Sequence, residues 1–352
     1  MIKLRLPPDY GSIETLNLDK LDANRRLGIV VPTFGRSAYV EQCLLSLSNS
    51  SLSNCILCLV DESLATPRYR SIQGFTLFPN VESEGMDIGR IPPSEPEFEK
   101  IVLNTDCCIA VNSAGWMKHT LNPKPTWMFN SHFCTYVSND YLKTHPEVSA
   151  IYREKVFEAD NKTTELIRNF LHPDIPVVKI FKTVHGNMFD SIRSAFDLLS
   201  EFTDTLVVLD SDTIHKNDWL ETLYATFRSL SSTYKGRPVI LSGFHTKEHP
   251  VLKNTPEYRI KASLGGCNMC MDVDTYKLIL RPVLTDVAWD HSIRTRMEEY
   301  NGIYAVTVPS VVQHIGKSGL WSNVKRFDSS SDFDRGPIGL FTDKICNYIS
   351  NF

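Results

Sequence analysis

The chain has 352 residues and a formal net charge of −4, with 42% hydrophobic and 22% charged residues. This composition is typical of a globular protein, and the length suits one large domain or two ordinary ones. The net negative charge argues against a surface built mainly for nucleic-acid phosphates, although a local basic groove is compatible with it. The N-terminus lacks the apolar core of a signal peptide, and no apolar run could span a bilayer. We therefore expect a cytoplasmic protein without a transmembrane segment, and leave peripheral attachment to a membrane and the oligomeric state open.

The cysteines are nine in number, and without a secretion signal we expect them to be reduced. Two Cys-x-x-Cys pairs, Cys55/Cys58 and Cys267/Cys270, could together suggest a zinc site. The first pair lies in a strand-like apolar run, where positions i and i+3 face opposite sides of a sheet. The preferred interpretation is therefore buried thiols that act as small hydrophobic side chains.

The first part of the chain predicts a βαβ unit. Residues 1–26 are polar and are expected to form an irregular arm over the surface. Residues 27–36 indicate a buried strand, 38–47 a helix with apolar residues at helical spacing, and 55–60 a second strand. Such an order favours a parallel pair of strands joined by a right-handed crossover.

Residues 66–170 interrupt this alternation. They are rich in proline and aromatic residues and contain an acidic stretch at 95–99. Residues 101–111 could form one strand, and 152–171 one or two helices. We interpret the whole segment as a large insertion rather than an independent domain.

The α/β alternation resumes at residue 177. Strands are predicted at 177–182, 206–209, 238–244 and 303–309, and helices at 188–202, 218–230, 276–280 and 291–300. The last residues, from 326 onward, are expected to form a tail that packs back on the domain or lies over the site.

An Asp-x-Asp triplet, Asp210-Ser211-Asp212, follows four consecutive apolar residues. Residues i and i+2 at a strand end point to the same side, so the two carboxylates should be neighbours, with Ser211 facing away. Carboxylates at the carboxyl end of a sheet strand suit a divalent cation and the diphosphate that it neutralises. The alternative is a capped strand end, because Asp and Ser also favour turns and helix starts.

Further motifs stand in a fixed order around this triplet. Before the triplet, Pro-Thr-x-Gly-Arg ends the first strand, and Asp61 follows the second. After it come three further motifs: Leu-Gly-Gly-Cys-Asn-Met from residue 264, Ala-Trp-Asp-His-Ser-Ile from residue 288, and a segment that ends in Gln-His-Ile-Gly at residue 316. In this order the chain resembles the GT-A glycosyltransferases, most closely the large inverting family that includes cellulose, chitin and many bacterial polysaccharide glycosyltransferases. The resemblance covers residues 27–65 and 175–320.

The resemblance implies an α/β fold of the GT-A type, a Rossmann-like nucleotide-binding mixed sheet flanked by helices, with a large insertion. The catalytic domain would span residues 27–325, after an N-terminal arm (1–26) and before a C-terminal tail (326–352). Within it, 27–65 would bind nucleotide, 66–170 would be the insertion, and 171–325 would hold metal and acceptor.

The implied activity is that of a hexosyl- or N-acetylhexosaminyltransferase (EC 2.4). It would move a sugar from a nucleotide-sugar, a UDP-sugar by family habit, to an acceptor hydroxyl with inversion, and would depend on Mn²⁺ or Mg²⁺. The acceptor class is open: glycan, lipid carrier, protein and modified nucleic acid all fit.

Donor-site roles follow position by position from the resemblance. The end of the first strand would line the nucleotide pocket, through Pro32, Thr33 and Arg36. Asp61 would accept a hydrogen bond from the base, or would simply be a turn former. Arg193 would contact the donor, as would Asp210 and Ser211 near the ribose or sugar. The metal would be held by Asp212 with Asp210 and His314, a set of carboxylate and imidazole ligands that manganese accepts.

Asp290 is the candidate general base. A sugar hydroxyl is a poor nucleophile and needs a carboxylate within reach to take its proton. Asp286 is the fallback, and a helix N-terminal carboxylate is the structural alternative. The family usually has an acidic residue just before this Asp; here Trp289 stands there, and its indole could stack on the acceptor sugar.

Four other interpretations compete with this one. A sugar nucleotidyltransferase would carry a long Gly-rich basic loop after the first strand, where this chain has only Thr-Phe-Gly-Arg. A P-loop kinase is excluded because Gly-x4-Gly-Lys-Ser/Thr is absent from the sequence. A non-catalytic nucleotide-sugar or glycan binding protein, or a retaining glycosyltransferase that needs no base at Asp290, stays open.

Overall fold

The structure is a computed structural model. It describes residues 10–17, 27–65, 161–183, 188–284 and 289–316, and shorter stretches at 71–72, 75–79, 82–83, 86–87, 108–112, 115–119, 128–130, 134–138, 143–144, 146, 329–330 and 332–333.

Four parallel strands form the centre of the molecule: β2 (Leu27–Thr33), β3 (Cys55–Asp61), β12 (Val177–Lys182) and β13 (Thr205–Leu209). Every residue of these strands is buried, which explains why β2, β3 and β13 are mostly apolar without alternation; β12 also buries Lys179 and Lys182. They lie in the order β12-β3-β2-β13, so the third, second, first and fourth of them along the chain are neighbours. In such a doubly wound sheet the ligand crevice lies at the carboxyl ends of the strands where the order reverses, here β2 and β13.

The complete sheet has ten strands and is mixed. Beyond β13 the order continues with β18 (Asn268–Asp272), β15 (Val239–Ser242), β19 (Ile303–Thr307), β17 (Tyr258–Lys261) and β16 (Val251–Asn254). Of these neighbouring pairs only β15 and β19 run parallel.

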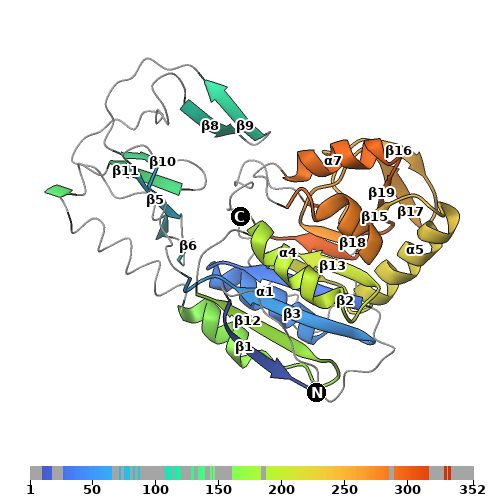
Figure 1. Cartoon of the computed structure of the whole chain (residues 1–352), viewed down its shortest axis with the longest axis horizontal. Coiled ribbons are helices and arrows are strands. Elements are labelled where there is room, and N and C mark those ends of the chain that lie inside the picture. The colour runs from blue at the N-terminus through green and yellow to red at the C-terminus, as the bar shows by residue number, and fades with distance from the viewer. Residues whose placement is uncertain are drawn as a thin grey trace.

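Helices cover both faces of the sheet (Figure 1). Side chains of α1 (Ser37–Ser48), α5 (Trp219–Thr233) and the helical residues 161–169 pack on one face. Those of α4 (Met188–Leu199), the π-helix η2 (Tyr276–Leu280), which follows the short α6 (Val273–Thr275), and α7 (Trp289–Glu299) pack on the other. The predicted α/β class, a mixed sheet flanked by helices, is confirmed and is consistent with a fold of the GT-A type.

The N-terminal segment differs from the prediction. Within residues 1–26, expected to be irregular, Tyr10–Leu16 form strand β1, which pairs antiparallel with β12 at the edge of the sheet. Its sequence is polar because most of its residues are exposed, and only Ile13 and Leu16 reach the two cores. An edge strand is held mainly by main-chain hydrogen bonds, so its side chains carry little pattern.

The segment 66–170 is described only in part. Its strands form a four-stranded sheet of β10 (Met128–Asn130), β11 (Cys134–Ser138), β5 (Phe75–Pro79) and β4 (Ser71–Ile72), and two hairpins, β6 (Glu82–Ser83) with β7 (Met86–Asp87) and β8 (Cys108–Asn112) with β9 (Gly115–His119). The strand predicted at 101–111 and the helix at 152–171 are described only from residues 108 and 161 onward.

The thiols of the first Cys-x-x-Cys pair lie on opposite faces of the sheet, as the strand pattern predicts. Cys55 packs in the core of the α1 face and Cys58 in the core of the α4 face, both fully buried. Burial raises the pKa of the Cys58 thiol to about 12. Cys270 is also buried, and none of these three cysteines forms a disulfide. None of the helices in the described part of the chain is both long and apolar enough to cross a membrane.

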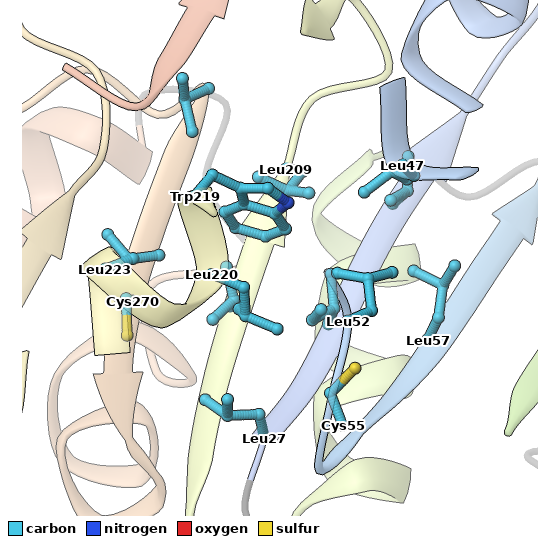
Figure 2. Close-up of a cluster of buried hydrophobic side chains, with 14 of the residues drawn as sticks. Leu27, Leu47, Leu52, Cys55, Leu57, Leu209, Trp219, Leu220, Leu223 and Cys270 are labelled. Atoms are coloured by element: carbon cyan, nitrogen blue, oxygen red, sulfur yellow. The ribbon is translucent and has the colours of Figure 1, made fainter. Parts of the chain in front are cut away.

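Trp219 at the start of α5 is the largest fully buried side chain among the described residues. Figure 2 shows its ring among Leu209, Leu220 and Leu223, with Leu47 and Leu52 in the same cluster. The ring therefore joins the end of β13 to α5 and α1, and its packing fixes the strand end from which the Asp-x-Asp triplet leaves.

We predict that Trp219→Ala lowers the free energy of unfolding by about 3–5 kcal/mol, because it leaves a large cavity. Trp219→Phe should cost much less: it retains most ring contacts, and the indole Nε1 has no hydrogen-bond partner among the described residues. Urea unfolding followed by far-UV circular dichroism measures both. Equal losses for the two variants would contradict a packing role for the ring.

Candidate functional site

Asp210, Ser211 and Asp212 form the turn after β13. The Asp210 amide donates to the Cys267 carbonyl at 2.8 Å, and the Thr213 hydroxyl donates to the Asp210 carbonyl at 2.7 Å. These two bonds hold the backbone of the turn, so the direction of the carboxylates is set by the main chain.

A small two-stranded sheet follows this turn. Strand β14 (Thr213–His215) pairs antiparallel with β20 (Val312–His314), with Thr213 opposite His314. The Ile315 amide donates to the Asp212 carbonyl at 2.8 Å. This pairing places His314 and Gly316 beside Asp212, although they are far away in the sequence.

The Asp212 carboxylate is the centre of the site. It is almost fully buried, and its Oδ2 lies 2.9 Å from Arg36 Nη2 and 3.3 Å from His314 Nε2. The predicted residues Arg36, Asp212 and His314 are therefore brought together from three separate segments of the chain.

The pKa values of the two carboxyl groups in this cluster shift in opposite directions. Burial alone would raise the pKa of Asp212, but the charges of His314 and Arg36 outweigh it and hold that pKa well below its usual range. Burial, and next the charge of Asp212, raise the pKa of Asp210 to about 7. Burial would lower the pKa of His314, but the charge of Asp212 and its hydrogen bond raise it. The carboxylate form of Asp212 is therefore favoured, and additional positive charge nearby would stabilise the carboxylate form of Asp210.

Two buried oxygens, Asp210 Oδ1 and Asp212 Oδ1, have no hydrogen-bond partner among the described residues. An unpaired buried carboxylate oxygen is costly, and hard oxygen atoms are the ligands that Mg²⁺ and Mn²⁺ prefer. In the described part of the chain, no three or more His, Cys, Asp and Glu side chains are grouped to hold a metal by themselves. The pair fits a cation that shares two carboxylates with phosphate oxygens and water, as Mg²⁺ commonly does.

Arg36 reaches Asp212 from the loop after β2. Gly35 and Arg36 both have φ near 60°, the left-handed region, and the Gly35 amide donates to Ser63 Oγ at 2.8 Å. The Arg36 guanidinium lies over the Tyr39 ring, with 4.6 Å between its Cζ and the ring centroid. This tight turn directs Arg36 from the end of β2 to the Asp212 carboxylate that follows β13.

Asp61 is buried at the end of β3, and both of its carboxylate oxygens accept hydrogen bonds from the protein. Its Oδ1 accepts from Thr33 Oγ1 at 3.3 Å and from the Ser63 amide at 2.9 Å, and its Oδ2 accepts from Thr164 Oγ1 at 2.6 Å. It joins the ends of β2 and β3 to the helical residues 161–169. Pro32 and Thr33 are buried as well. The base contact of Asp61 stays a prediction, and a role in positioning the strand ends is what its contacts show.

Arg193 belongs to a second charged network. Its Nη2 lies 2.7 Å from Asp190 Oδ1, and Asp190 Oδ2 lies 2.8 Å from Lys182 Nζ, which also contacts the buried Glu62 at 2.7 Å. This network lies at the ends of β12 and β3. The donor contact proposed for Arg193 stays a prediction.

Ser211 is half-buried in the turn, beside its two acidic neighbours. Asp290 lies in the first turn of α7, where a helix start was expected. Asp286, the fallback base, lies outside the described residues.

Residues 329–330 and 332–333, here called the return segment, pack back across the small sheet. Asp332 Oδ2 lies 2.6 Å from Arg259 Nη1, and the Ser330 amide donates to Gln313 Oε1 at 3.1 Å. Phe333 packs against a small cluster next to the site: Tyr39, Ile214 and Ile315. The expected packing of the tail on the domain is confirmed for these residues; the rest of 326–352 lies outside the described residues.

Comparison with known proteins adds little to this geometry. No family model matches the chain, and no curated protein matches it. The chain is similar to the crystal structure of S. aureus TarS 1-349, with a TM-score of 0.36 and 10% identity, over 82% of this chain and 59% of that one. It is also similar to the crystal structure of S. aureus TarS, with a TM-score of 0.34 and 10% identity, over 80% of this chain and 35% of that one. Similarities at these TM-scores do not indicate a function for this chain.

Gly316 is a residue whose importance the sequence did not indicate. A Cβ at this position would lie 2.0 Å from Asp212 Oδ2 and 2.8 Å from Arg36 Nη2. The backbone of residue 316 thus presses on the ion pair, and only glycine allows this approach.

We predict that Gly316→Ala destabilises the protein by on the order of 1–3 kcal/mol, because the added methyl group must displace the buried carboxylate. Gly265→Ala is the matched control, since its Cβ would meet only His249 Nε2 at 3.6 Å, an ordinary contact. Urea unfolding of the two variants beside the parent protein measures the difference. If both glycines tolerate alanine equally, the close approach at Gly316 is not a constraint on the site.

Proposed function

We propose that the protein is a metal-dependent glycosyltransferase of the GT-A type that uses a nucleoside-diphosphate sugar, with UDP as the expected nucleotide. The observation that carries this proposal is the pair of buried oxygens, Asp210 Oδ1 and Asp212 Oδ1, that have no hydrogen-bond partner among the described residues. They lie after β13, one of the two strands between which the order of the sheet reverses, where α/β proteins bind nucleotides.

Asp210 and Asp212 would hold the divalent cation, Mn²⁺ or Mg²⁺. When bound, the cation supplies Lewis-acid stabilisation of the charge that develops on the departing diphosphate. The raised pKa of Asp210, caused first by burial and then by Asp212, indicates a group that is stabilised as a carboxylate by added positive charge. His314 lies at hydrogen-bond distance from Asp212 and would orient that carboxylate or join it as a ligand.

The nucleotide would lie in the crevice between the ends of β2 and β13. Pro32 and Thr33 are buried at the end of β2, and the Thr33 hydroxyl donates to the Val60 carbonyl at 3.1 Å. Asp61 ties the same strand ends together. These residues would give the crevice a rigid floor, as precise positioning of a donor requires.

The proposal is tested by thermal unfolding with nucleoside diphosphates, each with and without Mn²⁺. A ligand that binds only the folded state raises its stability, by about 2.7 kcal/mol at a concentration 100-fold above Kd. One nucleotide, expected to be UDP, should shift the melting temperature of the parent protein only with Mn²⁺. Asp212→Asn should lose the shift, and Asp274→Asn, an exposed carboxylate on α6, should retain it. Absence of any nucleotide shift in the parent protein would contradict the donor site.

For the acceptor half of the reaction we propose Asp290 as the general base, with inversion at the anomeric carbon. General bases contribute about 10²- to 10⁴-fold to rate, so Asp290→Asn should reduce nucleotide release from the donor sugar by that factor while retaining the Mn²⁺-dependent thermal shift. Glu299→Gln, at the exposed end of α7, is the control. Substantial activity of Asp290→Asn would favour a retaining reaction or another base.

A further inference from the structure

The ion pair between Arg36 and Asp212 raises a question about how the carboxylate pair receives a cation. Arg36 already contacts Asp212 Oδ2 at 2.9 Å, and its guanidinium carries a permanent positive charge. The partnerless Oδ1 belongs to the same carboxylate. A divalent cation on that oxygen and a guanidinium on the other would be close neighbours of like charge, and would repel each other.

The two partners of this ion pair are held very differently. The Asp212 side chain is 8% exposed, and the backbone of Gly316 presses against it. The Arg36 side chain is 25% exposed and extends from a short loop over the Tyr39 ring. A change of partner would therefore move Arg36 rather than Asp212.

Arg36 also has the chemistry to accept a different partner. A planar guanidinium binds phosphate oxygens through two parallel hydrogen bonds, and stacking on an aromatic ring favours a defined plane for the fork. A diphosphate neutralised by a cation on Asp210 and Asp212 would lie in the same crevice as Arg36. The guanidinium could then exchange the carboxylate for the phosphates.

We propose that Arg36 is a built-in counter-ion of Asp212 that competes with the divalent cation, and that the donor diphosphate relieves this competition by taking over the guanidinium. This inference rests on the proposed function and adds that the cation and the nucleoside diphosphate bind cooperatively. The cation alone binds weakly, and nucleoside diphosphate and cation strengthen each other's binding. Such coupling is reciprocal and typically amounts to a 5- to 150-fold change in affinity.

The experiment is a titration of the full chain with Mn²⁺, in which free Mn²⁺ is followed by electron paramagnetic resonance, with and without UDP. Arg36→Gln removes the charge. Without UDP it should bind Mn²⁺ on the order of tenfold more tightly than the parent protein, and UDP should strengthen its Mn²⁺ binding less. Arg36→Lys retains the charge and, without UDP, should bind Mn²⁺ as weakly as the parent protein.

Two further variants guard against indirect effects. Arg36→Gly removes the charge at a position whose φ of 60° favours glycine, so it should fold even if Arg36→Gln does not, and should bind Mn²⁺ as tightly. Arg281→Gln removes another arginine from an ion pair with an aspartate, Asp197 on α4, and should leave Mn²⁺ binding unchanged.

The outcomes separate this inference from the proposed function. Mn²⁺ binding that depends on UDP in the parent protein, with no tightening in Arg36→Gln or Arg36→Gly, would overturn the counter-ion role and leave the glycosyltransferase proposal intact. Absence of Mn²⁺ binding in every protein, even with UDP, would overturn both. Tightening in Arg281→Gln as well would show a general effect of net charge, and would also overturn the inference.

Discussion

The contact between Arg36 and Asp212 joins the two strand ends between which the order of the sheet reverses, and the site depends on it. Arg36 follows β2, Asp212 follows β13, and their side chains meet at 2.9 Å across the crevice. His314 and Gly316 reach the same carboxylate because β20 pairs with β14. The site is therefore made where three segments converge on one buried carboxylate, whose ionised form their charges stabilise.

Packing and hydrogen bonds in the rest of the fold hold these three segments in place. The central parallel strands are buried on both faces, and Trp219 packs the end of β13 against α5 and α1. The hydrogen bonds of Asp61 join the ends of β2 and β3 to the helical residues 161–169. The return segment adds Phe333 next to Tyr39, the ring on which Arg36 lies. A binding site that must align a donor sugar benefits from such support, because small displacements of reacting groups are costly in rate.

The sequence predicted those parts of the structure that depend on local pattern. Strand β12 was predicted with its observed bounds, and the apolar run of β13 correctly placed the Asp-x-Asp triplet at a strand end. Strand β1 was missed because its exposed residues carry no pattern. The strands from Val251 to Asp272 were not predicted either: β16 is exposed along its whole length, β17 contains an Arg and a Lys among four residues, and the apolar core of β18 is only three residues long between Asn268 and Asp272. Three features of the site depend on partners that are distant in the sequence, which a single sequence does not reveal. They are the ion pair of Arg36, the hydrogen bonds to both carboxylate oxygens of Asp61, and the close approach of Gly316 to Asp212.

The central claim is that Asp210 Oδ1 and Asp212 Oδ1, which have no hydrogen-bond partner in the described part of the chain, form a cation site shared with a nucleoside diphosphate. Anomalous diffraction from crystals grown with Mn²⁺ and UDP tests it most directly. We predict one manganese peak at the carboxylates of Asp210 and Asp212 when UDP is bound, because hard cations prefer oxygen ligands. A nucleotide bound in the crevice with no manganese at these carboxylates, or manganese bound only elsewhere, would contradict it.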